Sequence, residues 1–171
     1  MRRCLGGEKC ISTYAMADGD SLDGLGTLLR RLVFALDGDV QAIYDEHGLA
    51  FRPRYFPIVR ALIAVDGLTV SQLATRIGIS QPAVTQTLAE MRRDGLVSVD
   101  RATDRRARAV RLTQEGHGMA RRLEPIWRAI GIAATQLDGE LSAPLGIVLR
   151  EALERLRAMP FRDRVRGRLE P

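Results

Sequence analysis

The chain has 171 residues, of which 46% are hydrophobic and 27% charged, which suits one domain or one protomer of an oligomer. Its net charge of +5 and isoelectric point of about 10.0 favour anionic partners such as nucleic acid or an anionic membrane surface. Two cysteines, Cys4 and Cys10, are too few for a disulfide scaffold, and their spacing matches no metal or redox motif.

The N-terminal sequence predicts a cytoplasmic protein. Arg2 and Arg3 are followed by no apolar run, so the pattern is not that of a signal peptide. The longest purely apolar run is the five residues 61–65, which is too short to cross a bilayer, so no membrane partner is expected. Residues 1–20 are glycine-rich and polar without periodicity, and they are predicted to form a disordered extension in which Met16 is an alternative start.

Two helices are predicted next. Ser21 is expected to cap a long helix whose apolar residues recur at helical spacing as far as Tyr44, with Gly48 following its end. A second helix is expected over about 53–65. Pro53 suits its first turn, whereas Pro57 is expected to shift the start of the helix or to bend it.

A helix-turn-helix is predicted between Thr69 and Gly95. Thr69 and Gln72 have the spacing of a capping box, and the short helix that they open is closed by Gly78. Ser80 is expected to cap the next helix, which Gly95 ends. Two short helices joined in this way form a helix-turn-helix.

The following segment predicts a β-hairpin, or wing. Residues 96–99 and 107–112 alternate as strands do, and residues 100–106 between them form a polar, charged tip. Nine arginines and four acidic residues fall within 91–122, a net charge of +5, whereas residues 11–50 carry a net charge of −5. The basic character therefore lies mainly in and around the wing.

The C-terminal part is predicted to be helical and to end in a basic tail. Thr113 is expected to cap a long helix, which Pro125 should kink. Ser142 is expected to cap a last helix with a leucine-rich face, and residues 161–171 are expected to form a basic tail.

The helix after Ser80 has two unlike faces. Val84, Leu88 and Met91 form an apolar stripe, while the opposite face lacks the Glu and Lys that a solvated helix usually carries. Short donors and acceptors at a helix N-terminus are what reading of the major groove requires. An ordinary solvated face, with Ser80 acting only as a cap, is the alternative. The candidate base-reading residues are Ser80, Gln81, Pro82, Ala83, Thr85 and Gln86.

Two stretches resemble the MarR family of winged helix-turn-helix transcription regulators. They are LTVSQLATRIGISQPAVTQTLAEMRRDGLV, residues 68–97, and DRRARAVRLTQEG, residues 104–116. The most specific part is the D-x-R…LT..G pattern, and the similarity extends over about residues 23–158. It implies a mainly α fold with a small β wing, in which a winged helix-turn-helix lobe (51–113) is joined to a long-helix dimerisation region (21–50 and 114–160).

The resemblance also implies a function. The expected protein is a homodimeric regulator, typically a repressor, that binds double-stranded DNA at a near-palindromic operator and is released by a small lipophilic or phenolic effector. Arg106 is expected in the minor groove, with Asp104 orienting its guanidinium, and phosphate contacts are expected from Arg101, Arg105 and Arg108. The residues implied for the effector pocket are Tyr55, Phe56 and Trp127. Members that sense oxidants carry a cysteine within the first long helix, where this chain has Val33, so peroxide sensing by that route is disfavoured.

An enzyme is the least favoured class. The sequence contains no nucleophile elbow, Walker loop or HExxH motif and no convincing acid pair, and no metal or cofactor is expected. The alternative function is a winged-helix module that binds proteins without sequence-specific DNA binding, because a fold does not fix a function.

Overall fold

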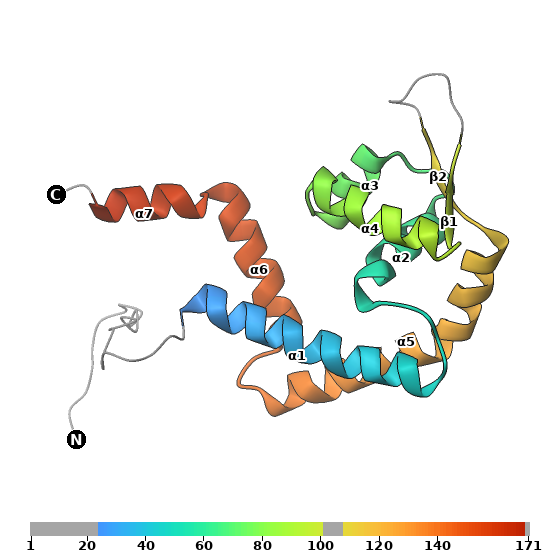
Figure 1. Ribbon diagram of the computed structural model, residues 1–171. Coiled ribbons are helices and arrows are strands. Elements are labelled where there is room, and N and C mark those ends of the chain that lie inside the picture. The colour runs from blue at the N-terminus through green and yellow to red at the C-terminus, as the bar shows by residue number, and fades with distance from the viewer. Residues whose placement is uncertain (1–23, 101–107, 170–171) are drawn as a thin grey trace, which may run out of the picture. The chain divides into compact units, whose positions relative to one another are not determined.

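A computed structural model describes residues 24–100 and 108–169 (Figure 1). The chain divides into two compact units, residues 1–48 and residues 49–171. In the first unit the described part is essentially one long helix. The described part of the second unit contains the helix-turn-helix, the wing, four further α-helices and a 3-10 turn.

The helix of the first unit, α1, spans Leu25–Glu46. Gly24 is its N-cap residue and supplies no side-chain cap, so the helix begins later than the expected cap at Ser21, which lies outside the described residues. At the other end His47 is the C-cap and Gly48 has φ +59°, the left-handed conformation expected after the helix. Tyr44 is buried, but most apolar side chains of α1 are exposed.

The expected helix over 53–65 is divided at its start. Pro53–Tyr55 forms a 3-10 turn (η1), and the α-helix proper, α2, spans Phe56–Ala64. Pro57 explains the division, because proline lacks an N–H and is tolerated only in the first turn of an α-helix. The shift of the start that Pro57 predicted is therefore confirmed.

The helix-turn-helix consists of α3 (Val70–Ile77) and α4 (Gln81–Arg93). Both halves of the capping box are present: Gln72 N donates to Thr69 Oγ1 at 3.2 Å, and Thr69 N donates to Gln72 Oε1 at 2.9 Å. Gly78 ends α3 with φ +78°, and Ser80 Oγ then accepts from Ala83 N at 3.4 Å. These caps confirm the predicted boundaries of both helices.

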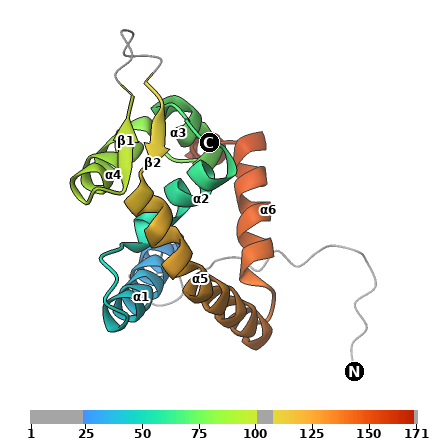
Figure 2. The same cartoon turned by 90° about the vertical axis from the view of Figure 1, so that its right-hand side faces the viewer.

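The wing is a two-stranded antiparallel sheet of β1 (Val97–Val99) and β2 (Val110–Leu112), in which Ser98 is paired with Arg111. Leu68 adds a further bridge to Val110 through two backbone hydrogen bonds of 3.2 and 2.8 Å. Both strands are shorter than the sequence predicted. Figures 1 and 2 show α3, α4 and the wing at the same end of this unit.

One core lies behind these elements. Leu73 of α3 and Val84, Leu88 and Met91 of α4 pack with α2 and the wing strands. The predicted apolar stripe of α4 is therefore buried, and Thr87 lies beside it with its hydroxyl bonded to Ala83 O at 3.0 Å. Burial of this stripe fixes which face of α4 points outward.

A long helix, α5 (Gln114–Glu140), follows the wing. Its predicted cap is confirmed, because Thr113 Oγ1 accepts from Gly116 N at 3.0 Å and also donates to Gly95 O at 2.6 Å. Thr113 thus links the start of α5 to the end of α4. Pro125 lies inside α5, and Figure 1 shows the helix changing direction along its length, as an internal proline predicts.

The C-terminal segment corrects one expectation and adds to another. The helix α6 spans Leu145–Ala158, and Pro144, not Ser142, is its N-cap residue. The capping group comes from α5, since Asp138 Oδ1 accepts from Leu145 N at 2.9 Å. The expected basic tail also contains a helix, α7 (Phe161–Leu169), in which Phe161, Val165 and Leu169 recur every fourth residue among arginines.

Candidate nucleic-acid interface

The outward face of α4 carries all six candidate base-reading residues. Each of them is exposed, while the apolar stripe behind them is buried. Ser80 occupies the N-cap position and Pro82 lies in the first turn. The structure therefore brings together Ser80, Gln81, Pro82, Ala83, Thr85 and Gln86 on one exposed surface.

Hydrogen bonds set the donors and acceptors that this face presents. Thr85 Oγ1 donates to Gln81 O at 2.9 Å, so its proton is used within the helix and its oxygen remains an acceptor. Gln81 Nε2 lies 3.4 Å from Ser71 Oγ, a long contact that steadies the amide against α3. The Gln86 amide bonds to no side chain in the described ranges, and it retains a donor and an acceptor.

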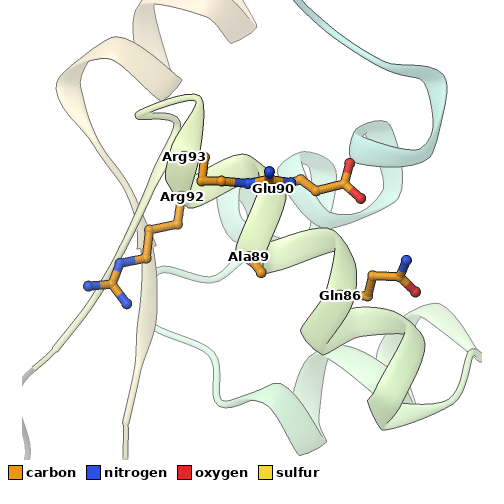
Figure 3. A pocket seen from close by; sticks show the side chains of 5 residues that line it. All are labelled: Gln86, Ala89, Glu90, Arg92 and Arg93. Carbon is orange, nitrogen blue, oxygen red and sulfur yellow. The ribbon is translucent and has the colours of Figure 1, made fainter.

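A surface depression of about 580 Å³ continues from Gln86 toward the C-terminal end of α4. Figure 3 shows Arg92 projecting to one side of the helix, whereas Gln86 and Glu90 project to the other. The exposed Arg92 and Arg93 stand in the last turn, where cations are favoured by the helix dipole. The depression is lined by Gln86, Ala89, Glu90, Arg92 and Arg93.

The base of the wing is held by Arg111, which nothing in the sequence distinguishes from the neighbouring arginines. Its guanidinium pairs with Asp66 and, at 3.3 Å from Nε, with Asp100 Oδ2. Gly67 has φ +74°, and a Cβ there would lie 2.9 Å from the Arg111 guanidinium carbon. Arg111 therefore ties the wing to the α2–α3 turn.

The wing tip lies outside the described residues. This applies to Arg101, Asp104, Arg105 and Arg106. Arg108 is described, and its side chain is exposed just before β2.

Two of the three residues implied for an effector pocket are in direct contact, and Phe51 connects the third, Tyr55, to them. The rings of Phe56 and Trp127 are edge-on with centroids 5.1 Å apart. Phe51, which was not among the predicted pocket residues, has its ring centroid 5.6 Å from that of Tyr55 and 6.0 Å from that of Trp127, and so joins the group. Tyr55 is fully buried, Trp127 is half-buried and Phe56 is 38% exposed. We call these four residues the aromatic cluster.

The Tyr55 hydroxyl leaves the aromatic cluster and reaches α4. It donates to Asp94 Oδ2 at 2.8 Å and lies 3.4 Å from Glu90 Oε2, which also pairs with Arg54. Burial, followed by the hydrogen bond to Asp94, raises the pKa of Tyr55 to about 12, so the hydroxyl stays protonated near neutral pH. Burial of Glu90 opposes its charge, but Arg54 outweighs that effect and the pKa of Glu90 is lowered.

No sequence signal pointed to this contact, because Tyr55 and Asp94 are separated by 39 positions. Within the part of the chain that the structure describes, no cluster of His, Cys, Asp or Glu is placed to hold a metal ion. No helix among the same residues is long and apolar enough to span a membrane.

Comparison with known proteins agrees with this geometry. A model of the MarR family matches residues 47–107. The DNA complex of the Mycobacterium tuberculosis regulator MosR is 25% identical with a TM-score of 0.63, covering 80% of this chain and 96% of that one. A MarR family regulator from Silicibacter pomeroyi is 26% identical with a TM-score of 0.60, covering 81% and 99%.

PcaV from Streptomyces coelicolor, solved with its natural ligand, shares the fold at 24% identity. Its TM-score is 0.61, and the match covers 84% of this chain and 99% of that one. A comparison with curated protein sequences gives no match.

The capped helix pair, the outward polar face of α4 and the antiparallel wing define a winged helix-turn-helix of the DNA-binding class. Residues 47–107 match the MarR family model, and the fold of a MarR family regulator extends over about four fifths of the chain. The chain is therefore similar to MarR-type transcription regulators, and this similarity favours a DNA-binding regulator over an enzyme.

Proposed function

We propose that this regulator binds a near-palindromic operator as a homodimer and represses transcription until a small lipophilic or phenolic effector releases it. The observation that carries the proposal is the α4 surface, where six short side chains are exposed and directly backed by core. Long charged side chains there would hold the helix away from the bases. Neutral donors and acceptors discriminate base edges by geometry, so α4 is the reading helix.

The wing positions the lobe on the duplex in this proposal. Arg106 enters the minor groove with its guanidinium oriented by Asp104, while Arg101, Arg105 and Arg108 contact phosphates. Arg111 takes no phosphate, because its guanidinium is engaged by Asp66 and Asp100 at the base of the wing. MosR, which matches most of this chain, has been solved with DNA, and this supports the proposal.

The homodimer accounts for apolar surface that would otherwise meet water. Exposed apolar surface on a helix marks an interaction site, and we assign it to dimerisation through residues 21–50 and 114–160. On α6 it includes Ile147, Val148, Leu153 and Leu156. On α1 it includes Leu25, Leu28, Leu29, Val33, Phe34, Leu36 and Ile43.

We place the effector at the aromatic cluster. Phe56 and Trp127 retain exposed ring surface, which suits an apolar or aromatic ligand. PcaV, which shares the fold, has been solved with its natural ligand. A regulator of chromosomal operators acts in the cytoplasm, which is the location that we propose.

Two alanine variants test the division of labour between α4 and the wing. Gln86→Ala should weaken binding to the operator by about 5- to 150-fold, the value of one bidentate amide–base contact, and leave its salt dependence unchanged. Arg108→Ala should weaken operator and scrambled duplexes alike and reduce the salt slope by about one unit, because a phosphate contact is lost. The measurement is duplex binding by fluorescence anisotropy over a series of salt concentrations.

Equal weakening of both duplexes by Gln86→Ala would mean that α4 does not read bases at that position. A wild-type chain with little duplex affinity at any salt concentration would favour the protein-binding module instead.

A further inference from the structure

We propose that Tyr55 is a positioning residue for the reading helix: its hydroxyl, bonded to Asp94, fixes the orientation of α4 and therefore the operator specificity of the protein. The inference rests on the proposed function, since it assumes that α4 reads bases. It assigns to a buried tyrosine outside the helix-turn-helix an indirect part in that reading, through the position of α4.

The core fixes which face of α4 points outward, and a directional contact sets the rotation of the helix more finely. Val84, Leu88 and Met91 hold the helix by apolar packing, which is non-directional. A hydrogen bond is directional, and the 2.8 Å contact from the Tyr55 hydroxyl to Asp94 reaches the C-cap residue of α4. At the N-terminal end, the contact of Gln81 with Ser71 is long, at 3.4 Å. The firm polar anchor is therefore at the C-terminal end.

The anchor is itself rigid. Tyr55 is fully buried, and its ring is edge-on to the buried Phe51 at 5.6 Å and 86°. It ends the 3-10 turn that Pro53 opens, so the backbone is restricted as well. A side chain held in this way transmits the position of α2 and η1 to α4.

The charges on α4 are consistent with this role. Glu90 and Asp94 are four residues apart near the C-terminus of the helix, where two carboxylates repel each other and oppose the helix dipole. The structure supplies their compensation from η1: Arg54 pairs with Glu90, and the Tyr55 hydroxyl bonds to Asp94. Each of the two acids is therefore paired with a side chain of η1.

Tyr55 connects two parts of the proposed mechanism. Its ring belongs to the aromatic cluster with Phe51, Phe56 and Trp127, and its oxygen bonds to the reading helix. A displacement of the ring by a ligand in the cluster would move the anchor of α4. Tyr55 thus joins the aromatic cluster to the reading helix.

The test is a comparison of operator discrimination. Wild-type protein first selects a preferred duplex from a random pool, and the Kd is then measured for that duplex and for a shuffled duplex at one salt concentration. Tyr55→Phe removes only the hydroxyl, and we expect it to raise the Kd for the preferred duplex about tenfold, within the range of one misaligned base contact. The Kd for the shuffled duplex should change less than about twofold, because phosphate contacts tolerate a small rotation.

Four further variants separate positioning from stability. Asp94→Ala should lower the ratio of the affinity for the preferred duplex to that for the shuffled duplex, as Tyr55→Phe does. The double variant should lower this ratio no further, because both changes break the same hydrogen bond. Asp94→Asn keeps an acceptor and should restore most of the ratio. Ile58→Val trims a fully buried side chain of α2 and should lower the Tm while leaving the ratio unchanged.

If Tyr55→Phe discriminated between the two duplexes as well as the wild type does, the inference would be overturned. The proposed function would still stand in that case, provided that the wild-type protein selects a preferred duplex. Additive losses in the double variant, or an equal loss in Ile58→Val, would also overturn it. A wild-type chain that selects no preferred duplex would overturn both the inference and the proposed function.

Discussion

Gly116→Ala is expected to destabilise the winged lobe strongly. Gly116 lies in the first turn of α5, against the end of α4 and the start of β1, and a Cβ there would come within 2.1 Å of the Leu96 carbonyl oxygen. That oxygen belongs to the backbone and already accepts from Thr113 N at 3.1 Å, so it cannot move aside cheaply. We expect a loss of about 3 kcal/mol or more in the free energy of unfolding, which corresponds to a fall in Tm of roughly 10 °C.

Gly118→Ala is the matched control, two positions further along the same helix. A Cβ at Gly118 would meet only the end of the Arg121 side chain at 3.9 Å. Alanine is the better helix former, so this variant should gain about 0.5–1 kcal/mol. Thermal unfolding followed by circular dichroism measures both variants. Equal Tm values for the two would show that the close approach at Gly116 does not constrain the lobe.

Leu36→Asp is expected to dissociate the proposed dimer. Leu36 lies near the middle of the α1 surface that we assign to dimerisation, and it is 45% exposed in the single chain. An aspartate buried there without a partner would cost several kcal/mol. The Kd of the dimer should therefore rise by at least about 100-fold. Analytical ultracentrifugation over a range of protein concentrations measures this change.

Thr27→Asp controls for the added charge. It introduces the same carboxylate into the first turn of α1, where an acidic side chain interacts favourably with the helix dipole. Its dimer Kd should match that of the wild type. A Leu36→Asp protein that stays dimeric at micromolar concentration would refute the assignment of this surface.

The sequence predicted the parts of the fold that depend on neighbouring residues. The Thr69–Gln72 box and the Ser80 and Thr113 caps were predictable because a cap and its partner are at most three positions apart. The cap of α6 was predicted wrongly at Ser142, since the group that serves it, Asp138, comes from the preceding helix. The α7 helix was overlooked because arginines and Gly167 mask its four-residue apolar spacing.

The candidate site also has one part that could be predicted from the sequence and one part that could not. The exposed face of α4 followed from the apolar stripe at Val84, Leu88 and Met91, since burial of one helix face defines the other. Two contacts join residues that are distant in the sequence: the Tyr55–Asp94 hydrogen bond, over 39 positions, and the Arg111–Asp66 ion pair, over 45. Such contacts depend on tertiary packing, which the hydrophobic periodicity of a single sequence does not predict.

The most direct test of base reading by α4 is the affinity of the wild-type protein for its selected duplex and for a shuffled duplex of the same composition, across a salt series. We expect the selected duplex to bind about 10³-fold more tightly or better. Both affinities should fall steeply as salt rises, because counterions are released from the phosphates. Equal affinity for the two duplexes at every salt concentration would contradict a reading role for α4.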